Sequence, residues 1–266
     1  MPQIHPTAIV EAGAALADDV TIGPYCCVGS QVKLGAGVVL QSHVVVTGDT
    51  TIGARTRAFP FVSLGQVPQD KKYKGEPARL EIGEDNVIRE GVTMNIGTEG
   101  GGMLTKVGDR SLFMAGSHIG HDCQVGHDTV FANNATLAGH VIVGDFAFLG
   151  GLSAVHQFCR IGQYAMVGGL TGVERDVIPY GMVVGDRARL VGLNLRGLQR
   201  NGFSGDAIRV IRQAYGELFT NEGTLVDRIE AVADKYADSP AVMEIIDFIR
   251  SDSSRRIVQP DTDHGA

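Results

Sequence analysis

Aliphatic side chains recur at every sixth residue, and this period constrains the fold more than any other feature of the chain. From Ile4 to Leu64, ten of the eleven positions six residues apart are Ile, Leu or Val. The period resumes over residues 82–94. After one more break it runs from Val107 to Val173, where all twelve positions are apolar. A period of six fits neither the 3.6 residues per turn of a helix nor the alternation of a single strand.

Glycine accompanies this period. The chain has 36 glycines among 266 residues, about twice the ordinary share, and many directly follow the periodic apolar residue, as Gly53 and Gly108 do. A six-residue period is typical of a parallel β-helix in which the apolar residue points inward and three hexads complete a coil. We expect the adjacent glycine to supply the positive φ of a sharp corner. Residues 1–186 therefore predict a mainly β domain built as a parallel β-helix.

Two segments interrupt the period, at about residues 66–79 and 97–106, and we expect both to be loops that leave the repeat. In solenoids such insertions often lie on the binding face. The first loop carries Gln69, Asp70, Lys71, Lys72, Lys74 and Arg79. Ammonium and guanidinium groups complement anionic oxygens, so this loop is a candidate phosphate-binding segment.

After residue 186 the hexads end, and residues 187–266 predict a C-terminal helical domain. Ser204, Thr224 and Ser239-Pro240 are candidate helix starts, for helices that extend to about residues 219, 236 and 250. We expect the three helices to pack on the open end of the repeat or on a neighbouring subunit. The polar residues 251–266 predict a disordered tail. Four arginines between the two parts are candidates for an acidic partner or a phosphate: Arg187, Arg189, Arg196 and Arg200.

Charge and composition exclude several classes of protein. The net charge of −7 argues against a nucleic-acid-binding module, which would usually carry a basic face. No apolar run approaches the roughly 20 residues of a membrane helix, and the first residues do not resemble a signal peptide. The four cysteines lack CxxC spacing, so reduced thiols in a cytoplasmic protein are the expectation.

Several histidines converge if three hexads form one coil. Residues 18 apart then lie on adjacent coils, so His121, Gly139 and Gln157 form a stack along one edge. His118, His140 and His156 lie within three residues of that stack. Two kinds of chemistry fit. Three neutral imidazoles can bind zinc, or one histidine can act as a general base beside an orienting carboxylate, as His121 and Asp122 would. The residues alone leave both open.

The chain resembles a known family in five segments. GQVPQDKKYKGEP, HIGHDC, NNATLAGH, AVHQF and GLNLRGLQRNGF, in this order on hexapeptide repeats, are similar to the UDP-N-acetylglucosamine O-acyltransferases of lipid A biosynthesis. The resemblance implies left-handed winding, a homotrimer with sites between neighbouring subunits, and no metal or cofactor. It implies transfer of an R-3-hydroxyacyl chain from acyl carrier protein to the glucosamine 3-hydroxyl of UDP-GlcNAc.

The resemblance also implies roles for individual residues. His121 would be the general base, Asp122 would orient it, and the Gly139 N–H would stabilise the oxyanion. Gly169 would leave an acyl channel open for a long chain. The residues that would contact the nucleotide, sugar or pantetheine are Gln69, Asp70, Lys72, His118, His140, His156, Gln157, Asn194 and Arg200. Basic groups near Arg200 would dock the acidic carrier protein.

Three departures from the family pattern leave alternatives. The family often has His where Asn95 stands, so a 3-amino analogue of the sugar is a second candidate acceptor. Arg196 and Asn201 replace residues near the nucleotide, which puts the base contacts in doubt. Further alternatives are the sister N-acyltransferase, a CoA-dependent acetyltransferase, a β-helical zinc lyase and a binding solenoid without catalysis.

Overall fold

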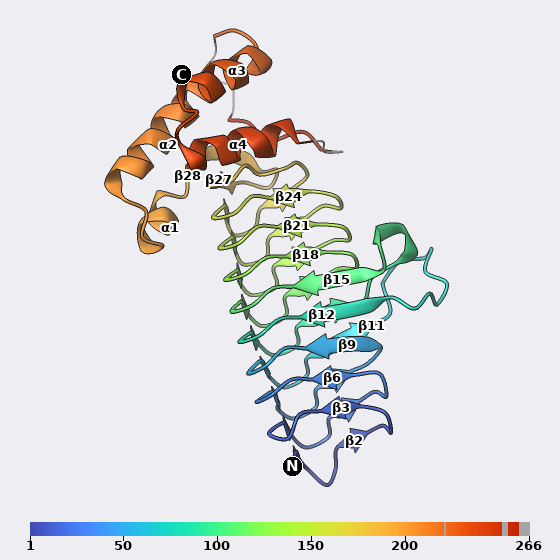
Figure 1. Ribbon diagram of the computed structural model, residues 1–266. Coiled ribbons are helices and arrows are strands. Elements are labelled where there is room, and N and C mark those ends of the chain that lie inside the picture. The colour runs from blue at the N-terminus through green and yellow to red at the C-terminus, as the bar shows by residue number, and fades with distance from the viewer. Residues whose placement is uncertain (221, 252–254, 261–266) are drawn as a thin grey trace.

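The computed structural model describes residues 1–220, 222–251 and 255–260. Short parallel strands stack into a long column, and helices lie at its C-terminal end (Figure 1). Up to β26 each strand pairs in parallel with the strand three places further along the chain, so consecutive strands belong to three different sheets in turn. At the end of the column β25 pairs with β27, and β28 pairs with β27 in the antiparallel direction. Three strands and their corners make one coil, which usually takes 18 residues, as in the pairing of His118 with Thr136.

The three sheets run along the length of the column. The strands of the first sheet are β1 (Gln3–Ile4), β4 (Thr21–Ile22), β7 (Val39–Leu40), β10 (Arg57–Ala58), β13 (Val87–Ile88), β16 (Leu112–Phe113), β19 (Val130–Phe131), β22 (Phe148–Leu149), β25 (Met166–Val167), β27 (Gly181–Val184) and β28 (Arg189–Leu193). The strands of the second sheet are β2 (Ile9–Val10), β5 (Cys27–Val28), β8 (Val45–Val46), β11 (Ser63–Gln66), β14 (Thr93–Asn95), β17 (His118–Ile119), β20 (Thr136–Leu137), β23 (Ala154–Val155) and β26 (Gly172–Val173). The strands of the third sheet are β3 (Ala15–Leu16), β6 (Lys33–Leu34), β9 (Asp49–Ile52), β12 (Arg79–Ile82), β15 (Leu104–Val107), β18 (Gln124–Val125), β21 (Ile142–Val143) and β24 (Arg160–Ile161).

The period of six correctly identifies the inward side chains. In most strands the last residue, at the periodic position, is buried, and these residues form the core from Ile22 to Val173. Ile4 at the open N-terminal end is exposed because no coil lies below it. The column is therefore filled mainly by aliphatic side chains, with Phe113 stacked on Phe131 as an aromatic exception.

The expected positive φ is found at Gly65 (φ 76°) and is wrong for the other glycines that directly follow the periodic apolar residue. Positive φ usually falls two residues after them, where other residue types adopt it, as Arg55 (φ 59°) and Asp122 (φ 60°) do. The glycines are needed for another reason. A Cβ on Gly53 would lie 2.5 Å from the carbonyl carbon of Gly83 on the next coil, and a Cβ on Gly108 would lie 2.5 Å from the oxygen of Gly126. They permit close stacking of coils rather than an unusual backbone angle.

Both interruptions of the period are loops at the same corner of the column. The chain leaves between β11 and β12 (residues 67–78) and again between β14 and β15 (residues 96–103), each time on the way from the second sheet to the third. The second loop includes one turn of 3-10 helix, Glu99–Gly101. We call this line of corners the loop edge. On the coils above, it continues at residues 120–123, 138–141 and 156–159.

The three expected C-terminal helices are present, and the prediction omitted one that precedes them. The helices are α1 (Leu195–Arg200), α2 (Gly205–Leu218), α3 (Leu225–Lys235) and α4 (Pro240–Arg250). Ser204 and Thr224 accept hydrogen bonds from their helices as N-caps, which is the usual role of Ser and Thr there. Helix α4 packs on the end of the column, where Arg160 donates to the carbonyl of Phe248.

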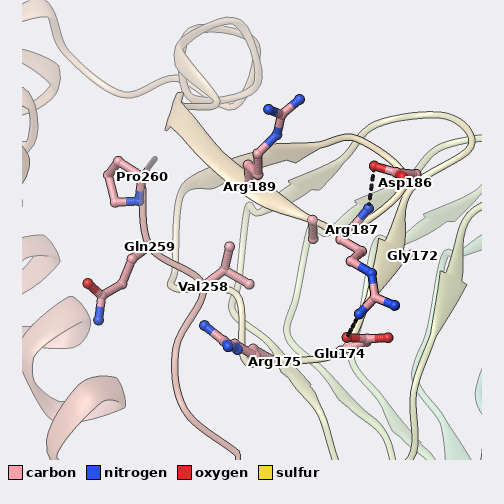
Figure 2. A pocket seen from close by; sticks show the side chains of 10 residues that line it. Gly172, Glu174, Arg175, Asp186, Arg187, Arg189, Val258, Gln259 and Pro260 are labelled. Atoms are coloured by element: carbon pink, nitrogen blue, oxygen red, sulfur yellow. Dashed lines mark hydrogen bonds and ion pairs between the residues drawn. The ribbon is translucent and has the colours of Figure 1, made fainter. Parts of the chain in front are cut away.

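The expectation of a disordered tail does not hold for residues 255–260. Ile257 and Val258 are buried, and Ile257 forms a β-bridge with Asp176, because apolar side chains in this polar segment reach the end of the core. Val258 also borders a cavity of about 490 Å³ with Arg175, Arg187 and Arg189 (Figure 2). The rest of that prediction, at 252–254 and 261–266, lies outside the described residues.

Candidate active site

The side chains that could take part in catalysis lie close together where the loop edge passes the two loops. His121 and Asp122 form the corner that follows β17, and His140 lies on the corner one coil above, where its N–H donates to the carbonyl of His121. The Phe158 N–H donates in turn to the carbonyl of Gly139. The stack of His121, Gly139 and Gln157 expected from the 18-residue coil is therefore confirmed.

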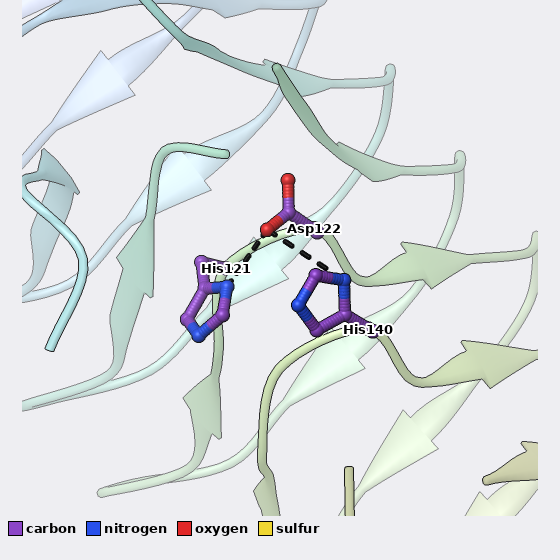
Figure 3. A group of neighbouring side chains, drawn as sticks. All are labelled: His121, Asp122 and His140. Carbon is purple, nitrogen blue, oxygen red and sulfur yellow. Dashed lines mark hydrogen bonds and ion pairs between the residues drawn. The ribbon is translucent and has the colours of Figure 1, made fainter. Parts of the chain in front are cut away.

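His121 and Asp122 form a hydrogen-bonded pair (Figure 3). Nδ1 of His121 lies 2.7 Å from Oδ2 of Asp122, and the carboxylate is fully shielded from solvent. The Asp122 N–H donates to Oγ1 of Thr105 at 2.7 Å, which fixes the left-handed corner. A buried carboxylate on one ring nitrogen orients the imidazole and leaves Nε2 for chemistry.

His140 lies beside this pair. Its ring meets the His121 ring edge-on at a centroid distance of 5.0 Å, and its Nδ1 is 3.8 Å from Oδ2 of Asp122. The opposite face of His140 stacks on Phe158, with centroids 4.5 Å apart. Burial lowers the pKa of His140 below its ordinary value, although the charge of Asp122 partly opposes this. His140 is therefore held mainly neutral near pH 7, as a hydrogen-bonding group.

Gly139 brings its backbone against the His121 ring. A Cβ at this position would lie 2.4 Å from Cε1 and 2.5 Å from Nε2 of His121, so only glycine fits while the ring keeps its place. The Gly139 N–H donates no hydrogen bond within the described part of the chain. A backbone donor without a partner there, on a residue that packs against the His121 ring, is suited to an oxygen that develops negative charge.

His118 lies on the outer face of β17 and hydrogen-bonds through Nδ1 to Oγ1 of Thr93 at 2.7 Å. Burial lowers the pKa of His118, and the neighbouring His121 lowers it further. The structure therefore places His118 next to the pair, as a largely neutral ring.

The two loops and the His140 corner enclose a cavity of about 510 Å³, and Asp70, Lys72 and His140 line it. Oδ1 of Asp70 accepts the Lys72 N–H at 2.9 Å, which holds the turn of the first loop. Glu76 joins the loops, because its Oε1 accepts the N–H of Glu99. Gln69 is exposed beside Asp70.

Five residues expected at the site do not meet His121 within one chain. His156 hydrogen-bonds to Arg255 at 2.9 Å, and Gln157 is exposed two coils above His121. Asn194 caps α1 and donates to the carbonyl of Tyr164, and Arg200 ends that helix. Figure 1 shows α1 on the opposite side of the column from the loops. Gly169 lies on another corner, between β25 and β26.

Sequence reasoning missed Thr98 and Phe158. Thr98 donates to both oxygens of Asp122, from its N–H at 2.7 Å and from its hydroxyl at 2.6 Å. The only signal was the break in the period at residues 97–102. Phe158 is the residue after Gln157 and lies one coil above His140, on which it stacks. The 18-residue spacing from His140 could have identified it.

Donor atoms of His121, Asp122 and His140 lie within 4.8 Å of one another, close enough to hold a metal ion (Figure 3). Both Asp122 oxygens already accept hydrogen bonds from Thr98, and one also accepts from His121. A metal would have to replace some of these bonds.

Family models match two parts of the chain. Residues 176–258 match the second domain of UDP-N-acetylglucosamine O-acyltransferase, and residues 104–139 match the bacterial transferase hexapeptide repeats. Within the described residues, no helix combines the length and the apolar character needed to cross a bilayer.

Curated relatives match nearly the whole chain. It is 47% identical over 258 residues to an acyl-[acyl-carrier-protein]–UDP-N-acetylglucosamine O-acyltransferase of Rhizobium johnstonii, covering 97% of this chain and 95% of that one. It is 48% identical to the enzyme of the same name from Rhizobium rhizogenes, with 99% and 97% covered. A solved UDP-N-acetylglucosamine O-acyltransferase from Moraxella catarrhalis is 41% identical, with a TM-score of 0.92 over 96% of this chain and 99% of that one.

Proposed function

Because the chain belongs to the UDP-N-acetylglucosamine O-acyltransferase family, we propose that it moves an R-3-hydroxyacyl chain from acyl carrier protein to the 3-hydroxyl of UDP-GlcNAc. This transfer is the first step of lipid A biosynthesis. The observation that carries the proposal is the His121–Asp122 pair, with the backbone of Gly139 packed against Cε1 and Nε2 of the His121 ring.

The reaction follows from this arrangement. Nε2 of His121 removes the proton of the sugar 3-hydroxyl, and Asp122 stabilises the imidazolium that forms. The sugar oxygen attacks the thioester carbonyl, and the Gly139 N–H donates to the resulting oxyanion. The carbon–sulfur bond then breaks, and the pantetheine thiolate takes the proton from His121. The step is balanced without a metal or an organic cofactor.

The cavity between the two loops would receive the nucleotide sugar. Lys72 supplies a positive charge for a phosphate, Asp70 an acceptor for a sugar hydroxyl, and the largely neutral His140 a further hydrogen-bonding group. Gln69 and His118 would contribute at its border. The lysine ammonium group is a compact positive charge that attracts phosphate oxygens.

We infer a homotrimer with sites between neighbouring copies. From β13 to β25 the outer face of the first sheet is apolar and only half-buried in one chain: Val87, Leu112, Val130, Phe148 and Met166. Such a face favours a partner. In this assembly a neighbouring subunit would contribute Asn194, Arg200 and Gly169, the last of which would limit the length of the acyl chain. The path of the pantetheine would be lined by His156 and Gln157.

The column itself is proposed to be a closed, left-handed β-helix over residues 1–186, followed by the helical domain of residues 187–266. The 18-residue stacking and the likeness to solved family members support this. The acidic carrier protein would dock on arginines at the end of the column, including Arg187 and Arg200. We place the enzyme in the cytoplasm, where its four free thiols would stay reduced.

A transfer assay with acyl carrier protein thioester and UDP-GlcNAc tests the proposal. We expect an active wild type and a loss of at least about 100-fold in His121→Ala. His127→Ala is the matched control, because His127 lies one corner further along the same coil. An inactive wild type contradicts the proposal, and full activity of His121→Ala contradicts the mechanism and favours a binding solenoid.

Two alternatives have their own tests. Bound zinc in elemental analysis, at one ion per chain, would favour the lyase.

The 3-amino analogue of the acceptor is tested by comparing its acylation rate with that of UDP-GlcNAc in the same assay. Asn95 is the residue in question, because it is buried, its Nδ2 donates to the carbonyls of Gln66 and Val67, and its Oδ1 has no partner among the described residues. Strong preference for the amino sugar would overturn the hydroxyl acceptor.

A further inference from the structure

One residue holds both oxygens of the Asp122 carboxylate. The Thr98 N–H donates to Oδ1 at 2.7 Å, and the Thr98 hydroxyl donates to Oδ2 at 2.6 Å. Thr98 is itself buried and comes from the second loop, 24 residues before Asp122 in the sequence. Hydrogen bonds to a charged acceptor are the strong ones, so this contact restrains the carboxylate in position and in rotation.

The loop that carries Thr98 is shaped around Asp122. A Cβ on Gly101 would lie 2.0 Å from Cγ of Asp122, and a Cβ on Gly97 would lie 2.8 Å from its Oδ1. Neither glycine has a positive φ, so the need for glycine comes from close approach, to Asp122 at Gly101 and to Leu104 and Met103 as well as Asp122 at Gly97. The loop therefore covers the carboxylate and excludes water from it.

Oδ2 of Asp122 has two imidazoles within reach. Nδ1 of His121 lies at 2.7 Å and Nδ1 of His140 at 3.8 Å. A carboxylate that rotated by a small angle would exchange one partner for the other. The Thr98 hydroxyl acts on this same oxygen, so it restrains the choice between them.

We propose that Thr98 is a positioning residue that keeps Oδ2 of Asp122 on Nδ1 of His121, so that the proton stays on Nδ1 and the lone pair on Nε2. A histidine in the wrong tautomer cannot accept the proton of the acceptor sugar, even when its ring is in place. This inference rests on the proposed function for its effect on rate, although its effect on the imidazole does not.

Thr98→Val is the direct test, because valine keeps the shape and the backbone donor and removes only the hydroxyl. We expect kcat to fall by about tenfold with little change in either KM, and Thr98→Ser to recover most of the rate. Thr129→Val is the matched control, since Thr129 is also buried and its hydroxyl donates to Ser111 on another corner. It should lose stability and keep kcat. An unchanged kcat in Thr98→Val overturns the proposal.

A double-mutant cycle separates positioning from a purely structural role. In an Asp122→Asn background there is no carboxylate to hold, so Thr98→Val should add little further loss. Additive losses would contradict the proposal. A second pair of variants leaves every hydrogen-bonding group intact. Gly101→Ala should lower kcat strongly, whereas Gly216→Ala in helix α2, whose Cβ would also meet nothing within 4 Å, should leave it unchanged.

A readout without substrate distinguishes failure of this inference from failure of the proposed function. Nitrogen-15 NMR of the His121 ring in the full chain reports the tautomer. We expect the Nδ1–H form in the wild type and a mixture in Thr98→Val. A changed tautomer in a protein without transfer activity would retain the positioning role and reject the proposed function. An unchanged tautomer overturns the inference even when the wild type is active.

Discussion

Gly139 lies directly against His121, one coil above it. A Cβ on Gly139 would come within 2.4 Å of Cε1 of the imidazole. This contact fixes one face of the ring, while Asp122 fixes its Nδ1. The corner stack thus brings the backbone of Gly139 up to Cε1 and Nε2 of the ring, on the side of the imidazole that Asp122 does not hold.

Gly139→Ala should therefore displace the imidazole and lower kcat by at least about 100-fold, the usual scale for loss of a general base or an oxyanion donor. Gly151→Ala is the control, because its Cβ would meet only the Asn133 oxygen, at 3.5 Å. Transfer rates and circular dichroism of both variants make the test. Wild-type transfer rates in a correctly folded Gly139→Ala variant would show that the contact between Gly139 and the His121 ring does not matter for catalysis.

Lys72→Ala should raise the KM for the nucleotide sugar by about tenfold, since a lysine–phosphate contact contributes roughly 1.5–3 kcal/mol. The effect on kcat should be smaller. Lys71→Ala is a matched control, because Lys71 is an exposed neighbour of the same charge that does not border the cavity between the loops. Equal effects of the two variants in steady-state kinetics would mean that only the net charge of the loop matters.

Gly169→Met should shift the preferred acyl donor toward shorter chains. The Cβ of a residue at this corner would lie 3.3 Å from the Gly151 oxygen, so the column can accept a side chain with a small adjustment. The added thioether would then occupy the proposed acyl path. Competition between carrier-protein thioesters of different length measures the shift, and an unchanged profile would show that Gly169 does not limit chain length.

Arg160→Met should destabilise the junction between the column and the helical domain. Arg160 donates from its N–H and its Nε to the two oxygens of Asp176, each at 2.7 Å, and Asp176 is fully buried. Removing one partner of a buried ion pair typically costs about 3–5 kcal/mol. Arg55→Met is the control, since Arg55 pairs with Asp85 in solvent, where such pairs contribute little. Urea unfolding of both variants measures the difference in stability. Equal unfolding midpoints of the two variants would contradict a stabilising role for the Arg160–Asp176 pair.

Acidification should destabilise the protein through His118. Burial lowers the pKa of His118 in the folded state, so the unfolded chain binds a proton more readily. The stabilising contribution is complete above the unfolded pKa of about 6.5 and is lost as the pH falls below it. Unfolding midpoints between pH 7 and pH 5 should therefore fall less in His118→Gln than in the wild type. Identical slopes would exclude His118 as the cause.

The period of six predicted the inward residues, the stacked corner of His121 and Gly139, and the place of both loops, because every coil obeys one rule. It gave the wrong reason for the glycines, since the limit at Gly53 is set by the next coil and not by its own backbone. It could not predict Thr98, because an inserted loop follows no period. Nor could it place Asn194 and Gly169, whose proposed roles depend on a second copy of the chain.

Both loops leave the column and return to the same corner, and the strands of the third sheet that follow them stay in register. Ile52 pairs with Ile82, 30 residues later, and Ile82 pairs with Val107, 25 residues later, where other coils take 18. The length of chain at this corner is thus independent of the architecture. Insertions, deletions or exchanges in these loops can therefore change what the protein recognises while the coils on either side keep their fold. For the same reason a foreign peptide can be grafted at this corner.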